Sequence, residues 1–483
     1  MRTPETIAPV YRQKRTLAGI AARMVWPTAI VFAVLIESSC GDTFRPIAQP
    51  IPLPPPNPAA AHLVLSLSSN GSLDPGAISR IDVSGDSVAS VAVTGVAPVH
   101  AAFSNSGTKV YIANSLEDTV SASSSSNPTQ ATTISLAQLC GGGGCLPSHP
   151  VFVNSTEPSK MYVANSGNGT ISVINTQSDV VIATVAVDPA FAGNPLPAPN
   201  SAANPVALAE LPNTSKIYSV NRGNSTVSSI STLDDTVQTV IHFAAPPVWA
   251  VAGSDSAFVY VLDTSGAISA INPLSDTVTG SSSAGAGANY MFLDPVFGRL
   301  YVTNPVAGTV SIFDVAGNIL NPHVGSPVSI TAAPGSGCAS APMPTAVTVL
   351  GDGSRAYVAS FQPDVNLVCT QATVIDSGTD TATSVISLPQ GQNLAAQTGC
   401  GTARFRTFAA SSGGGTNSNF KVYISQCDAG SVAVIDTFAS NTGTNQHPAD
   451  VLEATVPAPL SAFPPLSGPN PPSQNPVFVL AGP

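Results

Sequence analysis

The chain has 483 residues, of which 43% are hydrophobic and only 9% are charged, and its formal net charge is −11. This length and apolar content suit either several small domains or one large repeat array with a sizeable core. The acidic balance argues against binding to nucleic acid and against a polybasic membrane contact, because both select basic surfaces.

Residues 1–40 have the pattern of an export signal. Basic side chains precede an apolar run at residues 25–36, and small residues lead from that run to Cys40. The run has 12 residues, too few to span a bilayer, which needs roughly 20. The pattern resembles a bacterial lipoprotein signal, in which the cysteine is acylated, although Glu37 stands where that family has Leu. We therefore expect export to the bacterial cell envelope, either with a lipid anchor on Cys40, by plain secretion, or with an uncleaved anchor.

Residues 41–61 are rich in proline, with seven prolines between positions 45 and 61. Such a density favours an extended polyproline II spacer over a packed structure. The sequence predicts a tether here, followed by one folded domain at residues 62–483.

Eight copies of one unit fill that domain. Each copy has a Tyr-Val-like segment, a polar turn, and a second segment that ends in Asp or Asn; the clearest are residues 161–165 with 170–175 and residues 300–304 with 309–314. The central residues of the first segments lie 41 to 66 positions apart, and the shorter spacings match the roughly 40–45 residues of a propeller blade. These central residues are Leu65, Tyr111, Tyr162, Tyr218, Tyr260, Tyr301, Tyr357 and Tyr423.

Each copy reads as four short strands rich in Val, Ile, Thr and Tyr, separated by turns that contain Gly, Asn or Asp. Glycine supplies positive φ in such turns, and Asn and Asp bond to their own backbone. No helical period occurs in the domain. The sequence therefore predicts an all-β fold, a β-propeller of four-stranded blades.

The segments at residues 301–304 (Tyr-Val-Thr-Asn), 162–165 (Tyr-Val-Ala-Asn) and 110–114 (Val-Tyr-Ile-Ala-Asn) resemble the YVTN-type β-propeller repeat. In that family such residues form the second strands of blades. The family contains lactone hydrolases, surface-layer proteins and other exported propellers. The resemblance therefore implies the fold and leaves the function open.

The ends of the domain predict how the ring closes. The first copy has only three strands, at residues 63–67, 77–83 and 87–93, and a single strand remains at residues 477–480. That last strand is expected to complete the first blade and remove its open edge. Eight blades are favoured; seven would require the first copy to lie outside the ring.

Long insertions fall between blades and in one loop between second and third strands, and these connections open on the same face of a propeller. Loops of this kind carry function more often than the scaffold does. Six cysteines lie in or beside them, an even number that indicates three disulfides in an exported chain. We expect the pairs Cys140–Cys145, Cys338–Cys369 and Cys400–Cys427. The bridges either pin long loops or stiffen a binding rim.

The start of each innermost strand should line the mouth of the central channel on the same face. The side chains expected there are His100, His149, Asn204, Trp249, Asn289, Arg404 and Asn475, with Arg406 two residues further in. Histidines with an arginine can orient and protonate a carboxylate or lactone. Solvated channel groups that hold water are the other interpretation.

No standard catalytic, haem, zinc or nucleotide motif occurs in the sequence, so no cofactor is expected. The favoured hypothesis is an exported, membrane-anchored binding or scaffolding module that meets an envelope protein or glycan through its disulfide-pinned loop face. The alternative is a lactonase-like hydrolase or isomerase that uses His100, His149, Arg404 and Arg406 at the channel mouth.

Overall fold

The protein is described by a computed structural model, which covers residues 63–71, 74–136, 144–153, 159–188, 203–364, 367–392, 400, 406–412, 421–439, 448–459 and 475–482. The expected signal and the expected tether lie outside these residues. The described residues belong to one compact unit, residues 58–483. Among them, no helix is long and apolar enough to cross a membrane.

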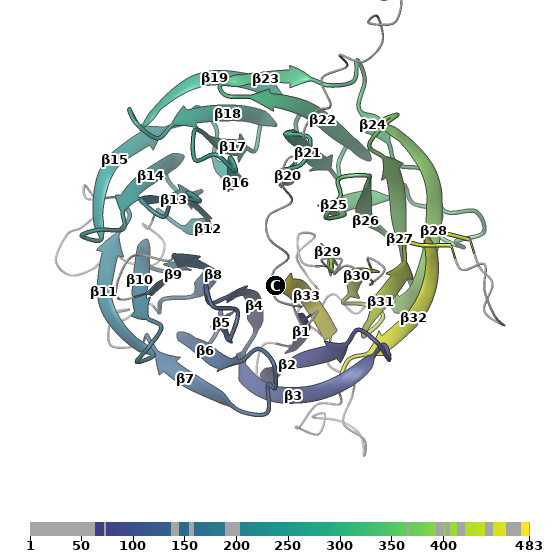
Figure 1. Ribbon diagram of the computed structural model, residues 1–483, viewed down its shortest axis with the longest axis horizontal. Helices are drawn as coiled ribbons and strands as arrows, with labels where there is room; N and C mark the ends of the chain where they lie inside the picture. The colour runs from purple at the N-terminus through teal and green to yellow at the C-terminus, as the bar shows by residue number, and fades with distance from the viewer. Residues whose placement is uncertain are drawn as a thin grey trace, which may run out of the picture. The chain divides into compact units, whose positions relative to one another are not determined.

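Eight antiparallel sheets stand in a ring around a central opening, and each sheet is one blade of a β-propeller (Figure 1). The expected fold class and the expected eight blades are confirmed. We number the blades 1 to 8 in the order of their second strands along the chain.

Blade 1 contains β33 (Asn475–Gly482), β1 (Leu63–Asn70), β2 (Asp74–Asp82) and β3 (Ser87–Val96). Blade 2 contains β4 (Pro98–Phe103), β5 (Lys109–Asn114), β6 (Thr119–Ser124) and β7 (Ala131–Ser135). Blade 3 contains β8 (Pro147–Val153), β9 (Lys160–Asn165), β10 (Thr170–Asn175) and β11 (Val180–Ala186). Blade 4 contains β12 (Pro205–Glu210), β13 (Lys216–Asn221), β14 (Thr226–Ser231) and β15 (Thr236–His242).

Blade 5 contains β16 (Pro247–Ala252), β17 (Val259–Asp263), β18 (Ala267–Asn272) and β19 (Thr277–Ser283). Blade 6 contains β20 (Tyr290–Asp294), β21 (Arg299–Asn304) and β22 (Thr309–Ala316), and its outermost strand is divided into β23 (Ile319–Pro322) and β24 (Val328–Ser329). Blade 7 contains β25 (Met343–Val349), β26 (Arg355–Pro363), β27 (Leu367–Asp376) and β28 (Thr381–Gln392). Blade 8 contains β29 (Thr407–Ser411), β30 (Lys421–Gln426), β31 (Ser431–Asp436) and β32 (Val451–Pro457).

The ring closes through its last strand. β33 pairs antiparallel with β1, so that Leu65 faces Leu480 and Leu67 faces Phe478. Blade 1 therefore takes its innermost strand from the end of the chain, as the three-strand first copy predicts. The alternative of seven blades is wrong, because the first copy is an ordinary blade of the ring. Each of its three strands extends three residues beyond its expected range at one end.

The repeated tyrosine of the second strand has a structural task that joins neighbouring blades. Among the described residues, the six largest fully buried side chains are all such tyrosines: Tyr111, Tyr162, Tyr218, Tyr301, Tyr357 and Tyr423. The Tyr111 hydroxyl donates to Asp179 Oδ1 at 2.6 Å, and the Tyr218 hydroxyl donates to Asp276 Oδ1 at 2.5 Å. Each aspartate lies in the turn between the third and fourth strands of the next blade. Burial, together with the aspartate, raises the pKa of these phenols far above the ordinary range, so they remain donors.

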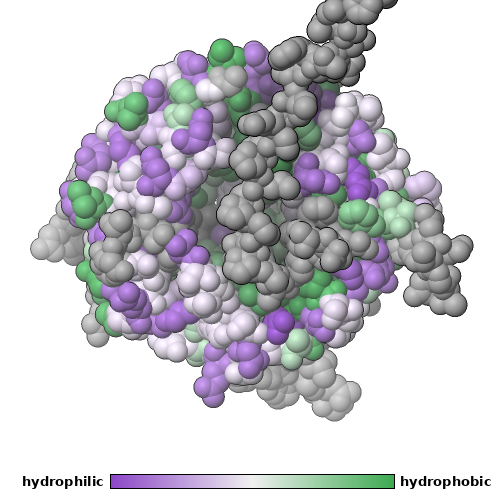
Figure 2. Space-filling view, viewed as in Figure 1, coloured by the Kyte–Doolittle hydropathy of each residue, from purple (hydrophilic) through white to green (hydrophobic). Residues whose placement is uncertain are grey.

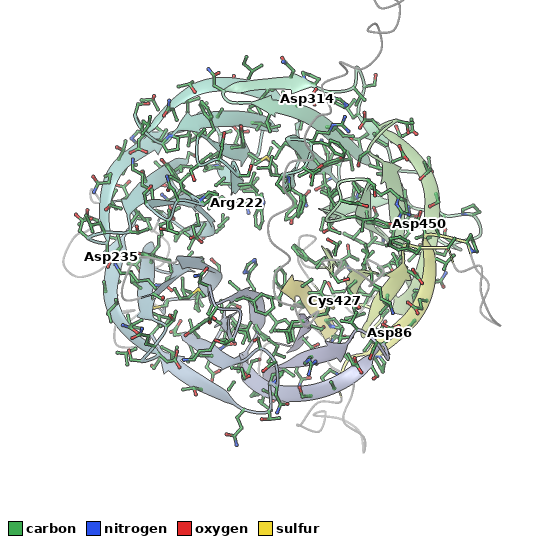
Figure 3. The ribbon with its side chains drawn as sticks, in the orientation of Figure 1. Asp86, Arg222, Asp235, Asp314, Cys427 and Asp450 are labelled. Carbon is green, nitrogen blue, oxygen red and sulfur yellow. A yellow bond between two sulfur atoms is a disulfide. The ribbon has the colours of Figure 1, made fainter. Side chains whose placement is uncertain are left out.

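A lysine or arginine two residues before the tyrosine pairs with the aspartate of the next blade. At four junctions, those of Tyr111, Tyr162, Tyr218 and Tyr357, the tyrosine hydroxyl bonds to the same aspartate. We call this cation–aspartate pair, with its tyrosine, the blade clamp. It occurs at six of the eight junctions in the described residues: Lys109–Asp179, Lys160–Asp235, Lys216–Asp276, Arg299–Asp380, Arg355–Asp450 and Lys421–Asp86. All six aspartates have positive φ, between 44° and 60°, which Asp tolerates better than most residues. Figure 3 labels Asp86, Asp235 and Asp450 toward the outer part of the ring.

The asparagine that ends the second strand ties it to the third. Asn165 Nδ2 donates to Thr170 Oγ1 at 3.0 Å and to Ser172 Oγ at 2.9 Å, and Asn165 is fully buried. The same bonds recur in blades 2 and 4 through Asn114 and Asn221. Both signature residues of the repeat, tyrosine and asparagine, are therefore accounted for by the scaffold.

Candidate functional site

The connections between blades and the turns between second and third strands open on one face, which we call the loop-bearing face. The turns between first and second strands and between third and fourth strands open on the other, which we call the short-turn face. The six clamps lie at the short-turn face, and the insertions and cysteines lie at the loop-bearing face. Figure 2 shows a hollow at the centre of the ring, with apolar residues in separate areas rather than in one patch.

Two disulfides fasten insertions to the loop-bearing face. Cys338, in the connection from blade 6 to blade 7, is bonded to Cys369 of β27 with a Cα–Cα distance of 6.1 Å. Cys400, in the connection from blade 7 to blade 8, is bonded to Cys427 at the end of β30 with a Cα–Cα distance of 5.6 Å. Both pairs are among those expected from the sequence. Cys145 is also in a disulfide, and its expected partner Cys140 lies outside the described residues.

Three buried glutamines add further ties on this face. Gln362 Nε2 donates to the Ser340 carbonyl at 2.7 Å, and Gln371 Nε2 donates to the Thr331 carbonyl at 2.8 Å. Gln426 Nε2 donates to the Pro389 carbonyl at 2.9 Å. All three side chains are at most 1% exposed. Each glutamine satisfies a backbone group of an inserted segment and so holds that segment at one point.

Arg406, one of the expected channel residues, is part of the same framework. Its guanidinium makes a two-pronged ion pair with Asp428, through Nε to Oδ2 at 2.7 Å and Nη2 to Oδ1 at 2.9 Å. The guanidinium also lies 5.2 Å from the ring centre of Phe361. Both partners are buried, so the pair fixes the start of blade 8. This arrangement accounts for Arg406 without a substrate.

His100 and Trp249 belong to a line of ring contacts along the inner strands. Trp249 lies 4.9 Å from Tyr290, Tyr290 lies 5.6 Å from Phe408, Phe408 lies 4.4 Å from Phe478, and Phe478 lies 4.4 Å from His100. These rings come from blades 5, 6, 8, 1 and 2, and all five are buried. Trp249 Nε1 also donates to the Met291 carbonyl at 3.0 Å. We call this set the aromatic arc.

The local structure accounts for the asparagines expected at the channel mouth, either through a hydrogen bond or through the backbone conformation. Asn204 precedes Pro205 with φ of 54°, and Ala97 and Leu146 have the same conformation before Pro98 and Pro147. Asn289 Oδ1 accepts a bond from Thr303 Oγ1 at 2.8 Å. Asn475 is buried at the start of β33. His149 lies in β8, while its side chain and all of Arg404 lie outside what the structure describes, so the grouping of the four candidate catalytic residues stays a prediction.

Sequence reasoning missed Arg222, at the turn between β13 and β14. Figure 3 places it at the inner edge of the ring, beside the central opening. Its side chain is exposed and makes no ion pair or hydrogen bond to the described residues. The signal was present in the sequence, because the matching position holds Ser115, Ser166 and Thr264 in blades 2, 3 and 5.

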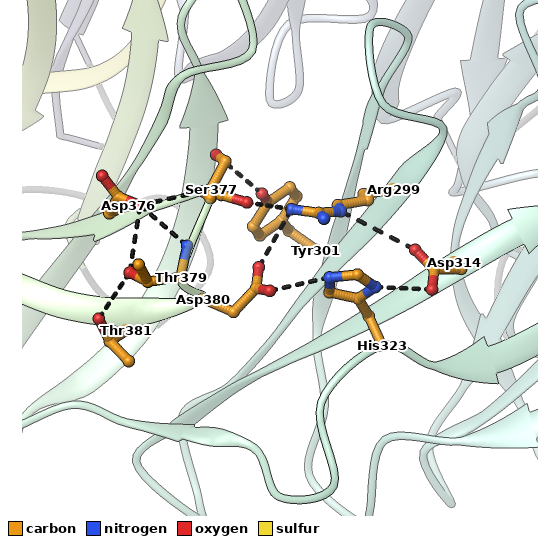
Figure 4. A network of polar contacts seen from close by, with 10 residues as sticks. Arg299, Tyr301, Asp314, His323, Asp376, Ser377, Thr379, Asp380 and Thr381 are labelled. Carbon is orange, nitrogen blue, oxygen red and sulfur yellow. Dashed lines mark hydrogen bonds and ion pairs between the residues drawn. The ribbon is translucent and has the colours of Figure 1, made fainter.

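Sequence reasoning also missed a polar cluster at the junction of blades 6 and 7 (Figure 4). His323 Nδ1 lies 2.6 Å from Asp314 Oδ2, and its Nε2 lies 2.8 Å from Asp380 Oδ2. Arg299 Nη1 contacts Asp380 Oδ1 at 3.1 Å. The Tyr301 hydroxyl bonds to Ser377 Oγ at 3.2 Å instead of to the aspartate. The cluster is thus a blade clamp with a histidine added, where the outermost strand of blade 6 is interrupted.

No group of three or more His, Cys, Asp or Glu side chains suited to a metal ion occurs in the described part of the chain.

No family model matches the chain, and no curated protein matches it. Solved structures with similar folds include Kuenenia stuttgartiensis hydrazine synthase, at 15% identity over 71% of this chain and 96% of that one, with a TM-score of 0.47. They also include the Myceliophteria thermophila Cps50 (Swd1) β-propeller domain, at 8% identity over 70% and 97%, with a TM-score of 0.47. Dihydro-heme d1 dehydrogenase NirN in complex with DHE is similar at 12% identity over 83% and 77%, with a TM-score of 0.52. At such identities the likeness concerns the fold alone.

Proposed function

We propose that this chain is an exported β-propeller that acts as a binding or scaffolding module through its loop-bearing face. One observation carries the proposal: the described parts of two insertions, between blades 6 and 7 and between blades 7 and 8, are fastened to one face by disulfides and buried glutamines, next to the buried Arg406–Asp428 pair. A surface held in one conformation before binding loses little entropy when a partner docks. The partner in this proposal is an envelope protein or glycan.

Export is supported by the disulfides, because such bonds persist in oxidising compartments. The sequence adds the signal pattern up to Cys40 and the proline-rich residues 41–61. In this proposal Cys40 carries a lipid, residues 41–61 form the tether, and residues 62–483 form the propeller, with repeats of the YVTN type. Mass spectrometry of the mature N-terminus tests the anchor: a diacylated Cys40 supports it, and an unmodified end overturns it.

The lactonase-like alternative receives no support from the described contacts. Arg406 is bonded at two nitrogens to Asp428, and His100 packs against Phe478 at 4.4 Å in the aromatic arc. A catalytic set must instead converge on one substrate atom. NirN is named as a dehydrogenase, but a fold shared at 12% identity transfers no activity.

The experiment compares the two faces of the full-length protein in capture from envelope extracts. Leu116 and Val306, 51% and 77% exposed, lie in second-to-third-strand turns on the loop-bearing face. Leu233 and Leu274, 90% and 97% exposed, lie in third-to-fourth-strand turns on the short-turn face and provide the matched control. We expect Leu116→Glu with Val306→Glu to lower the amount of captured partner at least about tenfold, which is about 1.4 kcal/mol of binding. Leu233→Glu with Leu274→Glu should leave it unchanged. Equal effects of the two pairs, or no captured component, would overturn the proposal.

A further inference from the structure

The clamp between blades 8 and 1 differs from the other five. Lys421 Nζ contacts two carboxylates, Asp86 Oδ2 of blade 1 at 2.7 Å and Glu453 Oε2 of its own blade at 2.7 Å. The side chains of Lys421 and Asp86 are 12% and 11% exposed. Each of the other three clamp lysines pairs with a single aspartate of the described structure. The junction, where Figure 3 labels Asp86, therefore holds a shielded amine against a shielded carboxyl group, with a second carboxylate beside the amine.

Glu453 reaches Lys421 from a β-bulge in β32. In six blades of the described structure, the outermost strand skips one residue in its pairing with the third strand, at the same place each time. A bulge turns the skipped side chain in a new direction. Because five of these blades form the bulge with an uncharged side chain, the fold does not require a carboxylate there. The skipped residues are Ala89, Ile182, Gln238, Thr279, Thr383 and Glu453.

Asp86 is held by fewer bonds than the aspartates of four other clamps. In those four, the tyrosine hydroxyl bonds to the aspartate. Here the buried hydroxyl of Tyr423 and the buried Oδ1 of Asp86 make no hydrogen bond to the described residues. Burial raises the pKa of Asp86 above the ordinary 3.8, against the lowering effect of Lys421, and the charge of Glu453 adds to the rise. An amine attacks a carboxyl group more easily in its neutral form than as a carboxylate.

We propose that Lys421 and Asp86 form an isopeptide bond, an amide between two side chains, and that Glu453 carries the proton transferred in this step. Glu453 first takes one proton from the ammonium. The free amine then attacks Cγ of Asp86, and one oxygen of Asp86 leaves as water, with the proton from Glu453 and a second proton from the nitrogen. The ammonium and the carboxylate thereby become one amide and one water. Glu453 ends ionised as it began, and no oxidant or cofactor takes part.

The charge on Lys421 is the main barrier to this step. Burial lowers the pKa of Lys421, but its bonds to Asp86 and Glu453 outweigh burial and raise the pKa above 10.5. Nζ must therefore lose a proton before it attacks, and the contact with Glu453 supplies the acceptor. Against this barrier, the two reacting groups are already in contact and need no encounter. The expected reaction is slow and occurs once in each chain.

The bond closes the ring where the chain itself does not. Blade 1 combines β33 from the end of the chain with β1, β2 and β3 from its beginning, and β33 is joined to β1 by non-covalent pairing. An amide between Lys421 and Asp86 links blade 8 to the first part of the chain across 335 positions. A cross-link over so long a loop strongly restricts the unfolded chain. This inference concerns the short-turn face and goes beyond the proposed binding role, on which it does not depend.

Peptide mapping of the full-length protein tests the bond. After reduction of the disulfides, we expect trypsin to release residues 81–109, which contain Asp86, joined to residues 407–483, with the combined mass lower by one water. Cleavage after Lys421 should be absent, because trypsin does not cut at an acylated lysine. Lys216 is the internal control: it lies 2.7 Å from its clamp aspartate but contacts no second carboxylate of the described structure, so trypsin should cut there normally. Separate peptides with cleavage after Lys421 would overturn the proposal.

Variants then assign the roles. Glu453→Gln introduces the residue type that blade 4 has at the same bulge, Gln238, so the fold is retained, and circular dichroism checks this. Linkage, followed at fixed times after synthesis, should be at least about a hundredfold slower in this variant. Lys421→Arg keeps a cation beside Asp86 and should abolish the link, because a guanidinium stays protonated. Thr383→Gln, at the same bulge in blade 7, should leave linkage unchanged. Equal rates of linkage in the wild type and in Glu453→Gln would overturn the proposal.

Discussion

The short-turn face and the loop-bearing face of this propeller are stabilised by different chemistry. On the short-turn face, the same three groups recur at six junctions, and each clamp joins one blade to the next. On the loop-bearing face, each tie is different, and it fastens an insertion to the blades beside it. Repeated ties are what ring closure needs, because every junction must hold. The loop contacts do not repeat, because each insertion has its own length and sequence.

The two kinds of tie predict different consequences of mutation. A clamp lies between two sheets, so its loss loosens a junction of the ring. A loop tie lies within a connection, so its loss changes a surface while the sheets remain paired. Mutations that break a clamp on the short-turn face should therefore lower the stability of the whole ring. Mutations that break a tie on the loop-bearing face should mainly loosen one connection.

Breaking a blade clamp should have the largest effect. Asp235 accepts bonds from Lys160 Nζ at 2.9 Å and from the Tyr162 hydroxyl. Asp235→Ala leaves the buried ammonium of Lys160 without its counterion, which costs about 3–5 kcal/mol. Urea unfolding followed by circular dichroism measures the loss of stability. Asp234→Ala is the matched control, because Asp234 is exposed and bonds only to near neighbours in its own turn, Ser231 and Thr236. It should change the free energy of unfolding by less than about 0.5 kcal/mol. Equal effects of the two substitutions would contradict the role of the clamp.

Removing a loop disulfide should cost less and act locally. Cys338→Ser with Cys369→Ser opens a loop of sequence separation 31 and should lower stability by about 2–4 kcal/mol, largely through the unfolded chain. Proteolysis should become faster within residues 330–342, while the circular dichroism of the sheets stays the same. Accelerated cleavage throughout the blades would instead show that this bridge stabilises the whole ring, and the contrast between the two faces would be lost.

The sequence was sufficient for the fold because the repeat is redundant. The spacing of the tyrosines, the three-strand first copy and the strand at residues 477–480 each point to eight closed blades, and an error in one copy is corrected by the others. The interrupted outer strand of blade 6 was not predicted. It depends on one short segment, residues 323–327, whose course follows from contacts with blade 7.

The site was less predictable because sequence position does not reveal pairing. In the sequence, Arg406 and Arg222 are both arginines at strand ends that open on the loop-bearing face, and nothing there distinguishes them. The structure bonds Arg406 to Asp428, 22 positions away, whereas Arg222 makes no ion pair with the described residues. The clamp aspartates were read only as turn residues, because their cationic partners lie one blade earlier. When the eight copies are aligned on their turns, Arg222 differs from the serines of blades 2 and 3, and the aspartate before the fourth strand recurs.

The smallest expected effect concerns a buried carboxylate at the short-turn face. Asp294 ends β20 and accepts the Val296 N–H at 2.8 Å through Oδ1, while its buried Oδ2 makes no hydrogen bond to the described residues. Burial raises the pKa of Asp294 above the ordinary 3.8, against the lowering effect of hydrogen bonds from the Val296 and Phe297 backbone. The folded state therefore binds more protons than the unfolded state just above pH 3.8, so the contribution of Asp294 to stability falls as the pH rises through that window.

Asp294→Asn keeps the Oδ1 acceptor and removes this titration, so its stability should fall less than that of the wild type between pH 4 and 7. Urea midpoints at unit steps of pH measure the difference. Asp255→Asn is the matched control, because Asp255 also accepts a backbone N–H, from Ala257 at 2.9 Å, but is exposed. If both variants shift the pH profile equally, burial is not the cause at Asp294. If only Asp294→Asn flattens the profile, the short-turn face contains a buried carboxylate that lowers stability at neutral pH.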